Sequence, residues 1–111
     1  MNNEVNLTRQ DWHKVETIAR ELAAAGVDRN EVGKVVAYLQ RRHHRQNFMS
    51  LLDRLPHSNY IRSNQTRNYF ERIRRVCRQH LQDITDDRQA VAILAWAFRL
   101  MTYYSARKVD S

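Results

Sequence analysis

The sequence predicts an all-α, compact four- to five-helix bundle, and two features of the chain support this fold class. Its 111 residues include only two glycines and one proline. Because β-rich folds need frequent turn residues, this scarcity favours helices joined by short loops. Apolar residues also recur at helical spacing behind recognisable N-caps. With 42% hydrophobic residues, the chain can bury a core as a single domain over residues 1–111, with loose tails expected at 1–7 and 109–111.

The first helix is expected over residues 8–25. Thr8 is a favourable N-cap, and Asp11 stands three residues later, as in a capping box with aspartate in the place of glutamate. Gly26 provides a left-handed C-terminal stop. Four apolar residues at helical spacing form its core-facing stripe: Trp12, Val15, Ile18 and Leu22.

The second helix is expected to begin at Asp28, with Glu31 completing an Asp-x-x-Glu capping box. Its apolar stripe consists of Val32, Val35, Val36 and Leu39. The basic stretch at residues 41–45 ends or extends this helix. Further apolar residues predict either a continuation or a short extra helix: Phe48, Leu51, Leu52 and Leu55. Pro56 closes that region, and residues 57–62 are expected to form a loop.

The third helix is expected from the N-cap Ser63 to about residue 83, and the fourth begins at Thr85 or Asp86. The stripe of the third helix consists of Thr66, Phe70, Ile73, Cys77, Leu81 and Ile84. Residues 91–104 are apolar almost all round. That pattern is typical of the central helix of a bundle, or of a helix with one face against another subunit.

The chain is strongly basic, with a formal net charge of +7 and a sequence pI of about 10.2. Only three of its 19 Lys and Arg residues are lysine. The planar guanidinium of arginine matches phosphate oxygens and stacks on bases. Residues 34–81 hold eleven basic and two acidic residues, a net charge of +9, so the second and third helices carry the whole excess. A polyanion is therefore the expected class of partner.

Helical geometry groups this charge into faces. On the second helix, four residues share the face opposite the valine stripe: Lys34, Tyr38, Arg41 and Arg45. On the third helix, Arg67, Arg74 and Arg78 follow one edge of the apolar stripe. Because few acidic residues are interleaved, contact with a nucleic-acid backbone is favoured over a merely solvated face. Membrane binding is not expected, since it would need an apolar face left uncovered.

No catalytic residue, metal site or cofactor is expected. His43 and His44 diverge on a helix, and Cys77 and His80 share a face with no third ligand at suitable spacing. One cysteine excludes an internal disulfide, and the lack of an apolar N-terminal signal predicts a cytoplasmic protein. A small nuclease that uses His43, His44 or His57 is one alternative.

The aromatic residues have two expected roles. Trp12 and Trp96 lie on apolar faces and are expected in the core. Three tyrosines stand near basic residues and could stack a base: Tyr38, Tyr103 and Tyr104. For the last two, packing with an outward hydroxyl is an equal alternative.

Two stretches of the chain resemble a known family. Residues 61–70 contain Ser63-Asn64-Gln65-Thr66-Arg67-Asn68-Tyr69, which matches a helix start of the form Ser/Thr-x-Gln-x-Arg-x-aromatic. Residues 92–107 form an apolar run that ends in tyrosine, a small residue and arginine. In this order, both are similar to the Csm-type small subunit of type III CRISPR–Cas effector complexes.

This resemblance implies a helical subunit with no catalytic activity of its own. Such subunits stack in several copies and contact guide RNA and target RNA through basic faces, without reading sequence. The implied partners are these RNAs, other subunits of the effector complex and further copies of the chain itself. Gln65 and Arg67 correspond to the first motif of the family, and Tyr104 and Arg107 to the second.

The expected function is therefore non-catalytic binding of an RNA backbone. The predicted RNA-binding residues are Lys34, Tyr38, Arg41, Arg45, Gln65, Arg67, Arg74, Arg78, Tyr104 and Arg107. A second hypothesis is an adaptor whose basic face binds an acidic partner protein. A third is a DNA-binding regulator, although the long loop before Ser63 does not suit a helix-turn-helix.

Overall fold

Five helices make up the described part of the chain, which confirms the predicted all-helical bundle. The computed structural model describes residues 6–42, 47–55 and 63–109, with side chains as far as Tyr103. In those ranges there is no strand, and the helices are α1 (Arg9–Ala24), α2 (Arg29–Arg42), α3 (Phe48–Arg54), α4 (Asn64–Leu81) and α5 (Asp87–Val109). The radius of gyration is 13.5 Å, close to the roughly 13 Å of a compact chain of this length.

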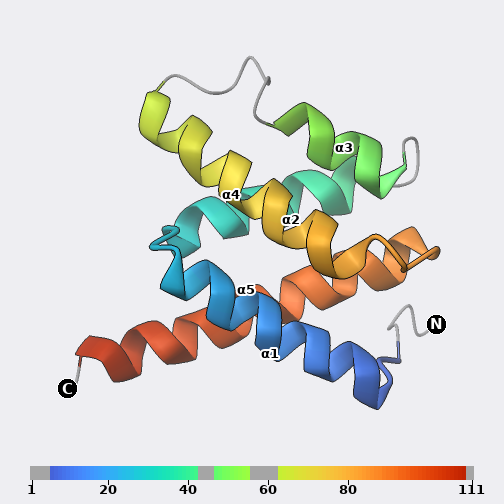
Figure 1. Ribbon diagram of the computed structural model, residues 1–111, viewed down its shortest axis with the longest axis horizontal. Helices are drawn as coiled ribbons and strands as arrows, with labels where there is room; N and C mark the ends of the chain where they lie inside the picture. Colours follow the sequence, from blue (N-terminus) through green and yellow to red (C-terminus); the bar gives the residue numbers. More distant parts are fainter. Residues whose placement is uncertain (1–5, 43–46, 56–62, 110–111) are drawn as a thin grey trace.

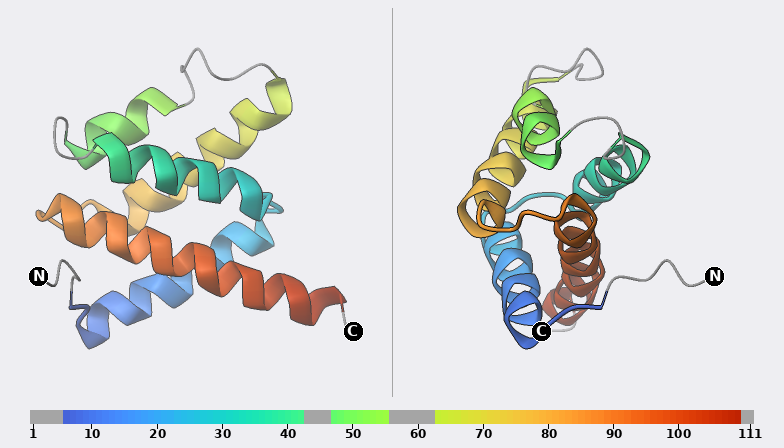
Figure 2. Two further views of the ribbon diagram at one scale, coloured as in Figure 1. Left: turned by 180° about the vertical axis from the view of Figure 1, so that it is seen from behind. Right: turned by 90° about the vertical axis from the view of Figure 1, so that its right-hand side faces the viewer.

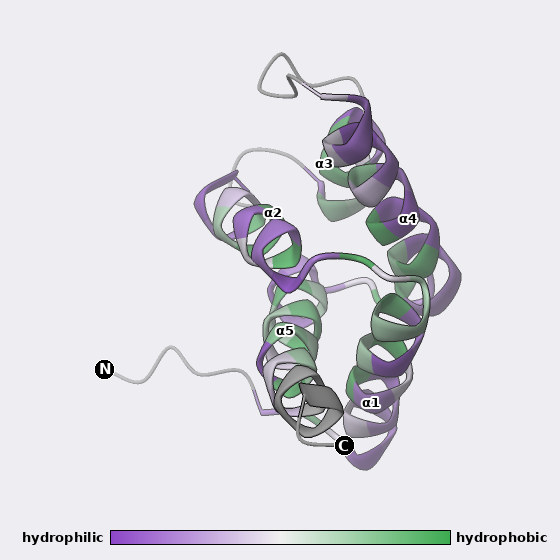
Figure 3. Cartoon of the chain, turned by 90° about the vertical axis from the view of Figure 1, so that its left-hand side faces the viewer, coloured by the Kyte–Doolittle hydropathy of each residue, from purple (hydrophilic) through white to green (hydrophobic). Residues whose placement is uncertain are grey.

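The helices form two layers. Helices α2 and α5 make one layer, α1 and α4 make the other, and α3 lies beside α4 at one end (Figures 1 and 2). The longest helix, α5, contacts α1, α2 and α3, in agreement with the central position that was one of the two alternatives for its apolar sequence. Figure 3 shows α4 with its hydrophobic residues turned toward the α2–α5 layer and its hydrophilic residues turned outward. This arrangement leaves the basic outer surfaces of α2 and α4 accessible.

The predicted cap of α1 is confirmed. Thr8 N donates to Asp11 Oδ2 at 3.0 Å, and Asp11 N donates to Thr8 Oγ1 at 3.1 Å, which closes the capping box. The Asp11 side chain is buried and also accepts from Gln89 Nε2 on α5 at 2.7 Å. Burial alone would raise the pKa of Asp11, but the hydrogen bonds from Thr8 and Gln89 and the charge of Lys14 outweigh it, so this pKa is lowered. Gly26 has φ +73°, the left-handed stop that the sequence predicted.

One helix start differs from the prediction, and two others decide between the predicted alternatives. Asp28 Oδ1 accepts from Asn30 N at 2.8 Å, but Glu31 pairs with Lys34 instead of reaching back, so the Asp28–Glu31 capping box was wrong. Residues 48–54 form a separate helix because the side chain of Asn47 caps it, accepting from Met49 N at 2.9 Å. At the start of α5, the side chain of Asp86 accepts a hydrogen bond from Arg88 N at 2.9 Å.

The core lies between the two layers and under α3. Its largest fully buried side chains are Val15, Ile18, Leu22, Leu39, Phe48, Leu51, Leu52, Ile73, Leu81, Ile93, Leu94 and Met101. The prediction that Trp12 and Trp96 belong to this core was wrong, because their exposed fractions are 42% and 40%. Each ring lies at the edge of its helix's apolar stripe, where the contact between α1 and α5 meets solvent. Within the described ranges, no helix is long and apolar enough to cross a membrane.

Candidate nucleic-acid interface

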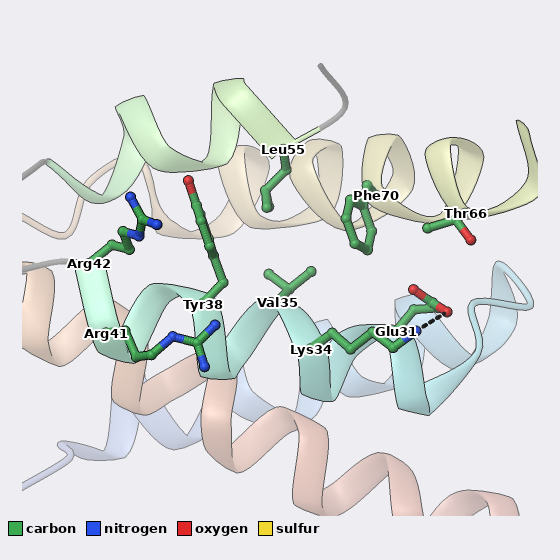
Figure 4. A pocket seen from close by; sticks show the side chains of 9 residues that line it. All are labelled: Glu31, Lys34, Val35, Tyr38, Arg41, Arg42, Leu55, Thr66 and Phe70. Carbon is green, nitrogen blue, oxygen red and sulfur yellow. Dashed lines mark hydrogen bonds and ion pairs between the residues drawn. The ribbon is translucent and has the colours of Figure 1, made fainter. Parts of the chain in front are cut away.

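The predicted basic face of α2 borders a groove between α2 and α4. Figure 4 shows this groove, which has a volume of about 240 Å³. Three apolar side chains from three different segments line it: Val35, Leu55 and Phe70. Lys34, Tyr38 and Arg41 also line it, as their spacing along one helix predicted. We call this the α2–α4 groove, and we define its rim as Glu31, Lys34, Tyr38, Arg41 and Arg42.

The rim carries three cations and one carboxylate. Lys34 Nζ lies 3.1 Å from Glu31 Oε1, and the lysine side chain stays 66% exposed. Arg42 places its guanidinium carbon 5.5 Å from the centroid of the Tyr38 ring, a cation–π contact one helical turn apart. Arg41 is exposed and has no ion-pair partner among the residues described. The rim therefore has a net charge of +2, held on an exposed surface over an apolar floor.

Glu31 places an unsatisfied acceptor in the same groove. Its side chain is only 12% exposed, and its second carboxylate oxygen, Oε2, is buried without a hydrogen-bond partner. In Figure 4 this carboxylate points toward Thr66 on α4, across the end of the groove. A buried carboxylate oxygen without a donor is unfavourable, so a water molecule or an N–H donor of a ligand would be accommodated there.

Two arginines of α4 form ion pairs with carboxylates of α3 and α4. Arg78 Nη1 donates to both oxygens of Asp53 on α3, at 2.9 and 3.0 Å, and Arg74 Nη1 donates to the same carboxylate at 3.3 Å. Arg74 also binds Glu71 at 2.5 Å, and this hydrogen bond is the main reason that its pKa is raised. Two arginines thus meet two carboxylates. This α3–α4 ion cluster (Asp53, Glu71, Arg74 and Arg78) has no net charge and holds α3 against α4.

The remaining predicted residues are placed as follows. Gln65 Nε2 donates to the Tyr69 hydroxyl at 2.8 Å, along the exposed first turns of α4. Arg67 is exposed, and it forms no ion pair with any residue the structure describes. Arg45 lies outside the described residues. Tyr104 and Arg107 belong to α5, but their side chains are outside the described part.

Sequence reasoning missed two members of the rim. Arg42 was absent from the predicted site, although its spacing of four residues from Tyr38 was a signal for a cation–π pair. Glu31 was assigned to capping, and its burial in the groove became visible only once α4 was docked. Outside the groove, Arg72 Nη1 donates to the Ala25 carbonyl at 2.6 Å and so satisfies the end of α1.

His80 and Cys77 have structural surroundings. His80 contacts the carboxylate of Glu21, and Lys14 donates to the His80 carbonyl at 2.8 Å, so both contacts join α1 to α4. Cys77 is fully buried, and burial raises the pKa of its thiol to about 12, which keeps it protonated and unreactive. No three His, Cys, Asp or Glu side chains in the described ranges lie close enough to hold a metal ion. His43, His44 and His57 fall outside those ranges.

Comparison with known proteins adds no relative to this geometry. No protein-family model matches the chain, and no curated protein or solved structure matches it significantly. The function therefore has to be inferred from the sequence, the α2–α4 groove and the exposed side chains around it.

Proposed function

We propose that this chain is a non-catalytic RNA-binding subunit that holds a phosphate backbone along the α2–α4 groove. One observation carries the proposal. Lys34, Arg41 and Arg42 line a single groove, and the only carboxylate among the described residues that line it is Glu31. A protein that used these cations only for solubility would have little reason to gather them over an apolar floor. Phosphates would neutralise them and release counterions.

The spacing of the cations suits a strand that runs along α2. Lys34 and Arg41 are seven residues apart on one face, which is about 10.5 Å along the helix axis. A backbone passing there can meet both cations in turn, and Tyr38 lies between them on the rim. Contacts of this kind go to phosphates, which carry no sequence information, so binding is expected to tolerate any RNA sequence.

The α3–α4 ion cluster changes the ranking of the predicted contacts. Because Arg74 and Arg78 already pair with carboxylates, they add no net charge to the surface. We therefore assign the primary phosphate contacts to Lys34, Arg41 and Arg42, with Arg67 as a further exposed cation on α4. This assignment retains the predicted face of α2 and reduces the role of the middle of α4.

The biological setting of the proposal comes from the resemblance to type III small subunits. Guide RNA and target RNA are the proposed ligands, and other effector-complex subunits and further copies of the chain are the proposed neighbours. The α2–α4 groove is compatible with this role because a backbone contact does not depend on which guide is bound.

A salt titration of binding to a random-sequence single-stranded RNA tests the proposal. The variant Arg41→Ala/Arg42→Ala removes two rim cations, and Arg9→Ala/Arg20→Ala removes two exposed arginines from α1 as a matched control. For a single strand, each phosphate contact contributes about 0.7 to the slope of log affinity against log salt. The rim variant should therefore flatten the slope by about 1.4, and the control should leave it unchanged.

Two results would contradict the proposal. Equal slopes for both variants would show that the contacts lie elsewhere on the surface. No RNA binding by the intact protein at physiological salt, with binding to an acidic protein instead, would favour the adaptor hypothesis.

A further inference from the structure

Both tryptophans of the chain lie together on the surface. Trp12 is in the first turn of α1 and Trp96 is near the middle of α5, and their ring centroids are 5.1 Å apart with the planes at 63°. This edge-to-face arrangement is favourable for an aromatic pair, yet the exposed fractions of the two residues stay at 42% and 40%. The pair therefore presents two large rings to solvent at the junction of the helices.

Two further side chains extend this surface along α5. Arg99 holds its guanidinium carbon 4.6 Å from the centroid of the Trp96 ring, and Tyr103 follows one turn later with an exposed fraction of 53%. With Val15, Glu16 and Leu100 they line a shallow groove of about 390 Å³ between α1 and α5. We call Trp12, Trp96, Arg99 and Tyr103 the aromatic platform.

We infer that the aromatic platform stacks bases of single-stranded RNA, an inference that rests on the proposed function. Every base has a planar face that stacks on tryptophan or tyrosine, and such stacking tolerates any sequence. The guanidinium of Arg99 lies over the Trp96 ring and supplies a cation for a phosphate of the stacked strand.

The size of the platform favours bases over a protein partner. Aromatic side chains have about 150–250 Å² of surface each, so three that are 40–53% exposed leave roughly 300 Å² uncovered. A stable protein interface covers about 800 Å² on each partner. Of the other residues that line this groove, Glu16 is exposed and charged, whereas Val15 is buried and Leu100 is half-buried, so they add little exposed apolar area. An area of this size matches a few stacked bases.

The platform and the α2–α4 groove are separate surfaces. Phe98 of α5 packs against Gly33 of α2, whereas Trp96 and Arg99 lie on the side of α5 that borders α1. Substitutions in one surface therefore leave the other in place. Stacking on the rings of the platform should contribute affinity that is independent of salt, and the cations of the groove, together with Arg99, should contribute the salt dependence.

Intrinsic fluorescence reports on this site directly, because both tryptophans of the chain belong to it. The probes are an oligoadenylate of about ten nucleotides and a strand of equal length that lacks all bases. The oligoadenylate should quench the fluorescence. The abasic strand should bind with the same salt slope but with lower affinity and without quenching.

Substitutions provide the second measurement. Trp12→Leu and Trp96→Leu should each weaken oligoadenylate binding by about fivefold to 100-fold and leave the salt slope unchanged. Trp12→Phe should retain most of the affinity because it keeps an aromatic ring. Circular dichroism and the thermal midpoint verify that each variant folds.

The outcomes separate the inference from the proposed function. Salt-dependent RNA binding without quenching, or equal quenching by the abasic strand, overturns the platform and leaves the groove proposal intact. Equal affinity of Trp12→Leu and the unchanged protein also overturns the platform. If no RNA binds, both fail, and quenching by an acidic protein alone would identify the platform as a protein contact.

Discussion

The α3–α4 ion cluster makes a specific prediction about how the molecule would respond to the loss of one carboxylate. Asp53 is the only residue of α3 shown to pair with Arg74 and Arg78, and it accepts from both. Replacing it by asparagine changes the charge of the cluster from zero to +1. Arg78 would then be available to a phosphate, whereas Arg74 would keep its pair with Glu71, and RNA affinity should increase at low salt.

The cost in stability should be small. The exposed fractions of the side chains are 47% for Asp53, 48% for Arg78 and 29% for Arg74, so solvent screens both pairs. Exposed pairs of this kind are worth about 0.2–1 kcal/mol each. Asp53 also stands in the last turn of α3, where a negative charge is unfavourable to the helix dipole and its removal returns about 0.3 kcal/mol. The free energy of unfolding of Asp53→Asn should fall by about 1.7 kcal/mol at most. Each kcal/mol shifts the melting temperature by about 4–8 °C.

Two assays measure these effects. Urea denaturation gives the change in the free energy of unfolding, and a salt titration with single-stranded RNA should show a slope steeper by about 0.7, for one additional phosphate. Asp83→Asn is the matched control, because it also removes an exposed carboxylate that pairs across helices, with Lys14 at 3.2 Å. A destabilisation above about 3 kcal/mol, the range for breaking a buried pair, would refute the reasoning on stability. An unchanged slope would show that Arg78 does not reach RNA even when released.

Three further effects are expected. Because the pKa of Asp11 is lowered in the folded state, its stabilisation is present above its ordinary value of 3.8 and is lost as pH falls through the lower folded-state pKa. The difference in unfolding free energy between the unchanged protein and Asp11→Asn should therefore be constant at neutral pH and shrink below about pH 4, and a pH-independent difference would contradict this. A Cβ at Gly33 would lie 3.0 Å from the ring of Phe98, so Gly33→Ala should destabilise the native chain. In a Phe98→Leu variant, which lacks the ring, the same substitution should stabilise the helix by about 1 kcal/mol. Additive effects of the two substitutions in this double-mutant cycle would argue against the clash. Glu31→Gln removes the one negative charge of the groove rim, so RNA affinity should rise at low salt. The free energy of unfolding should change by less than about 1 kcal/mol. Weaker RNA binding would indicate that the carboxylate accepts a hydrogen bond from the RNA.

Much of the local structure could be predicted from the sequence. The capping box at Thr8, the left-handed Gly26 and the N-cap at Ser63 are all present as predicted. Each depends on interactions between residues no more than four positions apart, so neighbours in the chain suffice to specify them. The face formed by Lys34, Tyr38 and Arg41 follows from helical periodicity in the same way.

The sequence left open whether residues 48–55 continued the second helix. The side chain of Asn47 resolves this, because it accepts from two backbone N–H groups at the start of α3 and so begins a new helix. Asparagine is a common N-cap, but nothing in its neighbours indicates that the chain must restart there. Phe48, Leu51 and Leu52 of this short helix are all buried. The apolar surface that they remove from water makes the packing of α3 as a separate helix favourable.

Other features were decided by tertiary structure alone. Asp53 meets Arg78 across 25 positions, and Trp12 meets Trp96 across a still longer separation. Periodicity tells which face of a helix is apolar, but not how far a neighbouring helix extends over that face. The angle and length of the α1–α5 contact left both tryptophans at its edge, and the docking of α3 converted two predicted phosphate ligands into members of a neutral cluster. For a charged or aromatic side chain at the edge of a helix's apolar stripe, burial depends on atoms that lie far away in the chain. Only the packing of the helices therefore decides whether such a side chain is exposed, buried in the core or paired with another side chain.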